Sequence, residues 1–268
     1  MRHLLLAAVA LGATAPLSLP IAPAFAQTAS PAIAKAVADP RRKAENRARD
    51  RYRHPAETLA FFGVKPNQTV VEVLPGGGWY SEILAPLLHD QGRYIAAVPA
   101  GGRAGFSRFT AADPARFGKV TVTEFAPGKV PIAPDGSADV VLTFRNVHNF
   151  LMGEDATPAA AFAAFFRALK PGGVLGVVDH RLPEGRDSAL EKKSGYLKRS
   201  TVVRLAEQAG FRLAGESEVN ANPKDTADWP DGVWTLPPTY QLKDKDRARY
   251  AAIGESDRMT LRFVKPAR

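Results

Sequence analysis

The chain has 268 residues, of which 45% are hydrophobic and 24% are charged, and its 22 Gly and 22 Pro are scattered along its length. These proportions are typical of a globular protein and exclude a disordered or collagen-like chain. The sequence contains no cysteine, which excludes disulfides, thiolate metal centres and a cysteine nucleophile. The formal net charge is +9 at pH 7, so the placement of the basic residues needs an explanation.

Residues 1–26 follow the pattern of a secretory signal peptide. Arg2 precedes the apolar run 4–11, and the small residues of Ala24-Phe25-Ala26 lie directly before Gln27. The apolar run is shorter than the roughly 20 residues that span a bilayer. A cleavable signal is therefore favoured, with an uncleaved N-terminal anchor as the alternative. We expect cleavage near Ala26, a periplasmic or secreted protein, and no stable membrane insertion.

A run of basic residues follows between positions 41 and 53, where only Glu45 and Asp50 are acidic. The basic residues are Arg41, Arg42, Lys43, Arg47, Arg49, Arg51 and Arg53. One interpretation is a patch that binds phosphate, nucleic acid or an anionic membrane surface. The other is a solvated helix in which Glu45 and Arg49 form a pair. We expect no nucleic-acid partner, because no aromatic ladder or nucleic-acid motif accompanies the charges.

The rest of the chain alternates between expected helices and strands. Residues 27–40, rich in Ala, Pro and Ser, predict a linker, and a short helix over 55–62 ends at Gly63. The β-branched run 69–74 predicts a strand buried on both faces. Further helices are expected over 79–88, 159–169 and 200–209, and further strands over 93–98, 119–125, 138–144, 174–179, 211–219 and 259–264.

Strands separated by helices predict βαβ units with right-handed crossovers. We therefore expect an α/β fold, with one domain over 41–268 built on a Rossmann-like, doubly wound, mostly parallel seven-stranded sheet. A glycine-rich loop, Pro75-Gly-Gly-Gly-Trp-Tyr80, follows the first strand. Ligands of such sheets bind outside the carboxyl ends of the strands, and glycines let the backbone approach a ligand. The loop predicts a ligand site, with a tight turn that binds nothing as the alternative.

Three short motifs follow one another at the first, fourth and fifth expected strands. They are Val70-Val-Glu-Val-Leu-Pro-Gly-Gly-Gly78, Pro134-Asp-Gly-Ser-Ala-Asp-Val-Val-Leu142 and Leu169-Lys-Pro-Gly-Gly-Val-Leu175. In this order they resemble the class I S-adenosylmethionine-dependent methyltransferases. Four further segments, Arg53-His-Pro55, Phe61-Phe-Gly63, Gly76-Gly-Gly-Trp-Tyr80 and Val178-Asp-His-Arg181, are similar to a poorly characterised group of predicted exported methyltransferases.

The resemblance implies S-adenosylmethionine as the cofactor. Gly76 and Gly78, with Gly77 between them, would line its methionine part, and Trp79 would wall the same pocket. Glu72 matches the family's acidic position, which helps to hold the amino group of the cofactor.

The end of the second strand departs from the family's pattern. There the family has an acidic residue that binds the ribose hydroxyls, but this chain has Val98, and no Asp or Glu occurs between Asp90 and Asp113. Losing charged hydrogen bonds to two hydroxyls would weaken binding by about 1.5–3 kcal/mol each. The resemblance thus predicts a cofactor site that is altered on its ribose side.

Polar residues at the ends of the fourth and fifth strands are candidates for contact with an acceptor. His148 and His180 are candidate general bases, and Asn149, or Asn146, would orient the acceptor. Arg145 and Arg181 would neutralise an anionic small-molecule substrate. Tyr80, beside the glycine loop, is a further candidate, and each of these residues is also open to a purely structural role.

No metal site is expected, because the histidines outside the signal peptide, at 54, 89, 148 and 180, are never spaced as i and i+4. The segment 229–240, rich in Trp and Pro, predicts either a lid over the strand ends or a loop packed on the sheet edge. The function that we expect is methyl transfer from S-adenosylmethionine to an unidentified small molecule. The alternative is a non-catalytic periplasmic ligand-binding or scaffold domain that retains the methyltransferase fold.

Overall fold

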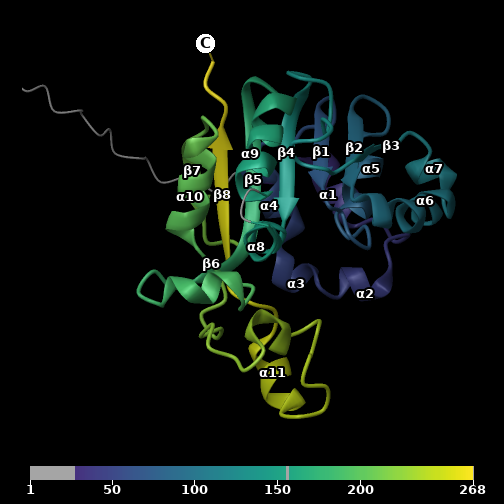
Figure 1. Ribbon diagram of the computed structural model, residues 1–268. Helices are drawn as coiled ribbons and strands as arrows, with labels where there is room; N and C mark the ends of the chain where they lie inside the picture. Colours follow the sequence, from purple (N-terminus) through teal and green to yellow (C-terminus); the bar gives the residue numbers. More distant parts are fainter. Residues whose placement is uncertain (1–27, 155–156, 268) are drawn as a thin grey trace, which may run out of the picture.

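Apolar and β-branched runs form the strands of one central sheet (Figure 1). The computed structural model describes residues 28–154 and 157–267, so the predicted signal peptide lies outside the described residues. The strands are β1 (Thr69–Val73), β2 (Arg93–Val98), β3 (Thr121–Glu124), β4 (Ala138–Phe144), β5 (Leu169–Leu182), β6 (Leu197–Lys198), β7 (Arg212–Ser217) and β8 (Arg258–Val264).

The sheet has the strand order β3-β2-β1-β4-β5-β8-β7. Strands β1 to β5 pair in parallel, whereas β8 runs antiparallel to both β5 and β7. The expected Rossmann-like, mostly parallel sheet is confirmed. Over the described residues the sheet has eight strands instead of the expected seven, because the two-residue strand β6 pairs with β5 off the main path. A strand of this length leaves no periodic pattern in a sequence.

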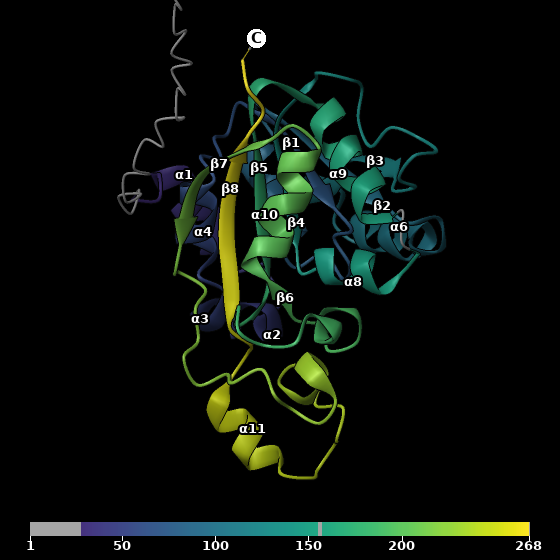
Figure 2. The same ribbon diagram turned by 60° about the vertical axis from the view of Figure 1, so that its left-hand side comes forward.

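Helices cover both faces of the sheet (Figure 2). They are α1 (Pro31–Val37), α2 (Ala44–Arg47), α3 (Asp50–Arg53), α4 (Pro55–Phe61), α5 (Ser81–Leu88), α6 (Arg103–Ala111), α7 (Pro114–Phe117), α8 (Val147–Met152), α9 (Thr157–Ala168), α10 (Arg199–Gln208) and α11 (Arg247–Ile253). One core holds Phe162 and Val202 of α9 and α10, and the other holds Leu59 and Ile83 of α4 and α5. Over residues 28–154 and 157–267, no helix is long and apolar enough to cross a membrane.

Part of the expected linker over residues 27–40 is instead a packed helix, α1. The Ser30 side chain accepts a hydrogen bond from Ile33 N at 3.3 Å, and Pro31 occupies the first turn. Ile33 and Ala36, one helical turn apart, are only 1% and 7% exposed and belong to the core that includes α4 and α5. The Ala- and Pro-rich composition suggested a linker, but two apolar residues on one face are enough to bury this short helix.

Residues 218–257, between β7 and β8, form a cap over the carboxyl ends of the parallel strands, where α11 projects from the sheet (Figures 1 and 2). The buried Asp225 holds the cap together. Its carboxylate accepts hydrogen bonds from Trp229 Nε1 at 2.7 Å, Asp257 N at 2.8 Å, Ala227 N at 3.0 Å and the Tyr196 hydroxyl at 3.0 Å. The cap includes the segment 229–240 that was predicted to be a lid or an edge loop.

Candidate functional site

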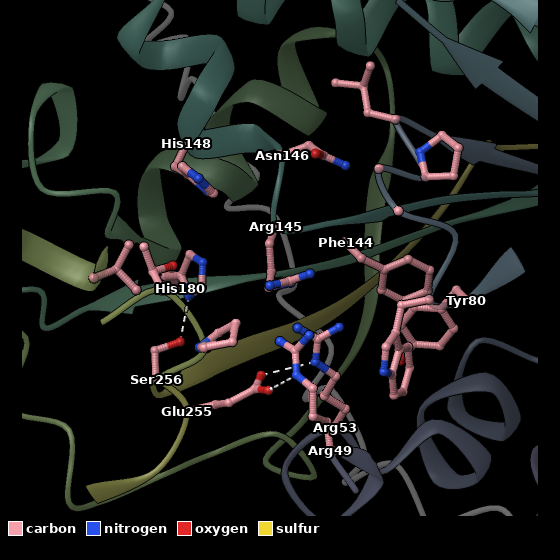
Figure 3. Close-up of a pocket in the computed structure, with 18 of the residues that line it drawn as sticks. Arg49, Arg53, Tyr80, Phe144, Arg145, Asn146, His148, His180, Glu255 and Ser256 are labelled. Carbon is pink, nitrogen blue, oxygen red and sulfur yellow. Dashed lines mark hydrogen bonds and ion pairs between the residues drawn. The ribbon is translucent and has the colours of Figure 1, made fainter. Parts of the chain in front are cut away.

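A cavity of about 370 Å³ lies at the carboxyl edge of the sheet (Figure 3). It is lined by the loop after β1, by the residues that follow β4 and end β5, by helices α2 and α3, and by the cap. The edge is where a doubly wound sheet is expected to bind a ligand. Val233, Trp234 and the prolines 237 and 238 of the cap line the cavity, so the segment 229–240 is placed as a lid would be.

The glycine loop contributes two of its three glycines to this cavity. Gly76 and Gly77 line it, and a Cβ atom at either position would meet no described atom within 4 Å. Gly78 is buried and does not line the cavity. Its φ is +82°, and a Cβ atom there would lie 2.7 Å from the Phe109 ring. Gly78 therefore serves close packing against α6, which corrects its expected placement beside the cofactor.

Glu72 lies at the base of the same cavity. Its Oε2 accepts hydrogen bonds from the Tyr94 hydroxyl at 2.5 Å and from Ser81 Oγ at 3.1 Å, whereas its Oε1 accepts none from the described residues. Burial raises the pKa of Glu72 to about 7, although the bonds from Tyr94 and Ser81 oppose the shift. The carboxylate is thus oriented through one oxygen and has the other available to a ligand.

Val98 does not line the cavity, which corrects its expected place in the cofactor site. It is 3% exposed, and its side chain packs in the same core as Ile83 and Leu84 of α5. Its carbonyl accepts a hydrogen bond from Phe125 N at 2.7 Å. The end of β2 therefore presents an apolar core residue where the family that the sequence resembles has a carboxylate.

Aromatic side chains wall the cavity beside the glycine loop. The rings of Tyr80 and Phe144 stack with their centroids 3.6 Å apart, and Trp79 packs edge-on against Tyr80. Burial raises the pKa of Tyr80, so its phenol stays protonated at neutral pH and cannot act as a base there. Its position supports a packing role more than the catalytic role that the sequence suggested.

His148 is held by the carboxylate of Asp179. Asp179 Oδ1 lies 2.7 Å from His148 Nδ1, and Oδ2 accepts hydrogen bonds from Val147 N at 2.7 Å and His148 N at 3.3 Å. A carboxylate only accepts, so Nδ1 carries a proton, and in the neutral form of the ring Nε2 has a free lone pair. Nε2 has no hydrogen-bond partner in the described part of the chain, and His148 lines the cavity. This arrangement suits a general base.

His180 lines the cavity with its ring centroid 5.0 Å from that of His148, and its Nδ1 lies 2.5 Å from Ser256 Oγ of the cap. Burial, together with the nearby His148 and Arg145, lowers the pKa of His180 well below its ordinary value, so it is neutral at pH 7.

Donor atoms of His148, Asp179 and His180 lie within 4.8 Å of one another, which is close enough for a metal ion. The carboxylate of Asp179 already accepts hydrogen bonds from Val147 N, His148 N, His148 Nδ1 and His180 N. No lone pair of Asp179 is left for a cation, so we interpret the group as hydrogen-bonded and not metal-binding.

Three arginines present guanidinium groups to one part of the cavity (Figure 3). Arg49 Nε and Arg53 Nε donate to the two oxygens of Glu255, at 2.6 and 3.0 Å. Burial alone would raise the pKa of Glu255, but Arg53, Arg258 and Arg49 outweigh it and lower this pKa to about 2. The Arg145 side chain forms no hydrogen bond or ion pair with any described residue. Burial lowers the pKa of Arg145 to about 10, so it remains charged at neutral pH.

The structure corrects two predictions about arginines. Arg181 does not reach the cavity, because Asp257 and Glu218 bind its guanidinium with four hydrogen bonds of 2.8–2.9 Å. The basic run is only partly a solvated helical segment: Arg41, Lys43, Arg47 and Arg51 are exposed in or beside α2 and α3, whereas Arg42 and Arg53 are 1% and 3% exposed. Arg49 pairs with Glu255, not with Glu45.

The two asparagines take different places. Asn146 is buried, and its Nδ2 donates to Val73 O at 2.9 Å, so it ties the end of β4 to β1. Asn149 is exposed and lines the cavity.

Arg49 and Arg53 belong to the basic run for which a phosphate-, nucleic-acid- or membrane-binding patch was one interpretation, but their place in this cavity was not predicted. The roles of Glu255 and Ser256 were missed. Arg49 and Arg53 are spaced as i and i+4, which places both on one helical face.

The fold is similar to that of solved S-adenosylmethionine-dependent methyltransferases. One, from Aquifex aeolicus, is 18% identical with a TM-score of 0.56, over 87% of this chain and 98% of that chain. A geranyl diphosphate methyltransferase in complex with S-adenosylmethionine is 15% identical with a TM-score of 0.52, over 87% and 94%. The [4+2]-cyclase SpnF is 16% identical with a TM-score of 0.53, over 79% of both chains.

No protein-family model matches the sequence, and no curated protein matches it significantly. Identities of 15–18% establish the fold alone. A cyclase shares this fold, so the reaction has to be argued from the site.

Proposed function

We propose that this protein transfers a methyl group from S-adenosylmethionine to a small-molecule acceptor, and that it does so outside the cytoplasm. The main support is one cavity that has Glu72 and the open glycine loop on one side and the Asp179-oriented His148 on the other. The predicted signal peptide supports the compartment.

The residues of the loop side fit the methionine part of the cofactor. The available Oε1 of Glu72 would accept from its ammonium group, and Gly76 and Gly77 would let the backbone lie close to it. S-adenosylmethionine supplies an electrophilic methyl group on a sulfonium. Tyr80, Trp79 and Phe144 wall this part of the cavity.

The residues of the opposite side fit proton removal from an acceptor. His148 Nε2 would take a proton from a hydroxyl, amine or thiol as it attacks, and Asp179 would hold the ring and stabilise the imidazolium that results. His180 is neutral and lies against His148, so it does not add a second positive charge beside that imidazolium.

One observation favours a second function. Val98 is buried in the core where a carboxylate would bind the ribose, which supports a non-catalytic ligand-binding or scaffold domain that retains the fold. The two functions differ in whether the adenosyl ligand binds at all.

Calorimetric titration of S-adenosylmethionine and S-adenosylhomocysteine into the purified full chain separates them. Methyl transfer predicts saturable binding that Glu72→Gln weakens by about tenfold or more, the loss expected for one charged hydrogen bond. Glu191→Gln, at a buried glutamate bonded to Lys198 N outside the cavity, is the matched control and leaves binding unchanged. No saturable heat from folded wild-type protein would exclude the methyl-transfer proposal and favour the binding domain.

A further inference from the structure

We infer that Arg145, Arg53 and Arg49 form a binding site for the oxyanion group, a carboxylate or a phosphate, of the acceptor. The identity of the bound molecule as an acceptor rests on the proposed methyl transfer, whereas the oxyanion site stands on the geometry alone. The observations are an excess of positive charge, buried donors without partners, and the position of these donors in the cavity.

The charges that face this part of the cavity do not balance. Arg49, Arg53 and Arg145 line it, and the only carboxylate bound to any of them within the described residues is Glu255. Glu255 is shared further with Arg258, whose Nη1 donates to it at 3.1 Å. Glu72, the other acidic residue of the lining, bonds to Ser81 and Tyr94. The excess positive charge is available to an anion.

Two buried guanidinium nitrogens of this group have no hydrogen-bond partner in the described part of the chain. Nη2 of Arg53 and Nη2 of Arg49 are buried and make no hydrogen bond within the described residues. The Arg53 side chain is 3% exposed and still lines the cavity. Burying a charged donor without an acceptor is unfavourable, so these groups point to an oxyanion as the missing acceptor.

Arg145 is placed for the same ligand by an unusual backbone. Its φ is +60°, a conformation that side-chain-bearing residues rarely adopt. Its N–H donates to Val178 O at 2.7 Å, which fixes the turn after β4. The turn directs the guanidinium into the cavity, between His180 and the stacked Phe144 and Tyr80 (Figure 3).

This position relates the oxyanion to the proposed chemistry. A carboxylate or phosphate on Arg145 would hold the rest of a small molecule between His148 and the glycine loop. Charge-assisted, bidentate pairing with arginine fixes orientation as well as affinity. The site therefore selects acceptors by a negatively charged group at a fixed distance from the methylated atom.

The carboxylate of the cofactor itself is the competing ligand. Arg145 follows β4 and Arg53 ends α3, whereas Glu72 lies in β1 and the glycine loop follows that strand. Three guanidinium groups also exceed what one carboxylate pairs with in a bidentate manner. We therefore assign the arginines to the acceptor, and competition with S-adenosylhomocysteine tests this assignment.

The test is a calorimetric titration of sodium phosphate and of sodium benzoate into the full chain, with chloride keeping the ionic strength constant. The variants are Arg145→Met, which removes no hydrogen bond to a described residue, and Arg199→Met, an equal charge change at the Arg199–Glu216 pair outside the cavity. We expect at least one oxyanion to bind the wild type. Its affinity falls about ten- to a hundredfold in Arg145→Met, stays unchanged in Arg199→Met, and persists with saturating S-adenosylhomocysteine.

Three results would overturn the inference: no binding of either oxyanion, equal affinity in Arg145→Met, or displacement of the oxyanion by S-adenosylhomocysteine. The melting temperature of Arg145→Met should be no lower than that of the wild type, which excludes misfolding as the cause of a lost affinity. If S-adenosylhomocysteine does not bind, the titrations without it still decide the oxyanion site, so failure of methyl transfer is distinguished from failure of this inference.

Discussion

The carboxylate of Asp179 positions His148 twice, through the ring and through the backbone. Oδ1 lies 2.7 Å from Nδ1 of the imidazole, while Oδ2 accepts from the backbone N–H of Val147 and of His148 itself. One buried side chain at the end of β5 thus fixes both the first turn of α8 and the tautomer of its histidine. The positioning leaves Nε2 as the group that faces the cavity.

We predict that Nδ1 of His148 carries a proton that it donates to Asp179, and that His148→Gln removes the general base. Long-range ¹H–¹⁵N NMR spectra should show a protonated Nδ1. With an acceptor in hand, kcat should fall by about 10²–10⁴-fold while affinity for S-adenosylhomocysteine stays the same. His89→Gln, at the surface pair with Asp90, is the control. Unchanged turnover in His148→Gln would show that another group removes the proton.

Glu72 predicts a dependence of cofactor affinity on pH. Burial raises its pKa to about 7, and only the ionised carboxylate attracts the ammonium of S-adenosylmethionine. Titrations at pH 6 and pH 8 should therefore differ by about tenfold in Kd, with tighter binding at pH 8. In Glu72→Gln the difference should vanish. A wild-type Kd that is the same at both pH values would show that Glu72 does not bind the ammonium.

The raised pKa of Glu72 also predicts how the stability of the folded protein changes with pH. The folded state holds the Glu72 proton more tightly than the unfolded state, so the stability that comes from this proton is lost as pH rises from about 4.5 to about 7. The loss amounts to about 3 kcal/mol of unfolding free energy. Urea unfolding gives the unfolding free energy of the wild type and of Glu72→Gln at each pH in this range. The wild type should lose more of this free energy than the variant as the pH rises. The same pH dependence in both proteins would contradict the raised pKa of Glu72.

The strands could be predicted because their signals are local. The strands predicted over residues 93–98 and 138–144 have the same first and last residues as β2 and β4. Continuous apolar runs between turn residues identify such buried strands. The short helix α1 was missed because a single pair of apolar residues, Ile33 and Ala36, buries it.

The site was only partly predictable because its members come from distant parts of the chain. Some site residues lie at or just after strand ends, and the topology brings these ends to the carboxyl edge of the sheet. They are His148, His180, Glu72 and Gly76. No local pattern in the sequence predicts that Glu255, 206 residues after Arg49, pairs with Arg49 where the basic run lines the cavity. Likewise the sequence shows that Val98 is apolar but not that the end of β2 faces the core.

Helix α1 should contribute measurably to stability. Ile33 is 1% exposed against α4 and α5, so Ile33→Ala should lower the unfolding free energy by about 2–5 kcal/mol through lost burial and a residual cavity. The exposed Lys35→Ala, in the same helix, should change it by less than about 0.5 kcal/mol. Urea unfolding of both variants measures this. Equal stability of the two would mean that residues 31–37 behave as the linker that their composition suggested.

The cap should depend on the Asp225 carboxylate, which accepts from four groups and donates to none. In Asp225→Asn an amide NH₂ replaces one acceptor oxygen and faces an N–H donor, which costs about 1–3 kcal/mol for each bond lost. Hydrogen exchange should accelerate over residues 218–257 and remain unchanged in β1 and β4.

Because Glu255 and Ser256 reach the cavity from the cap next to Asp257, oxyanion affinity should fall in Asp225→Asn although residue 225 does not line the cavity. Asp228→Asn, at an exposed position of the same segment, should change neither hydrogen exchange nor affinity. Unchanged exchange in the cap of Asp225→Asn would show that the cap is held by its apolar contacts, with the carboxylate contributing little.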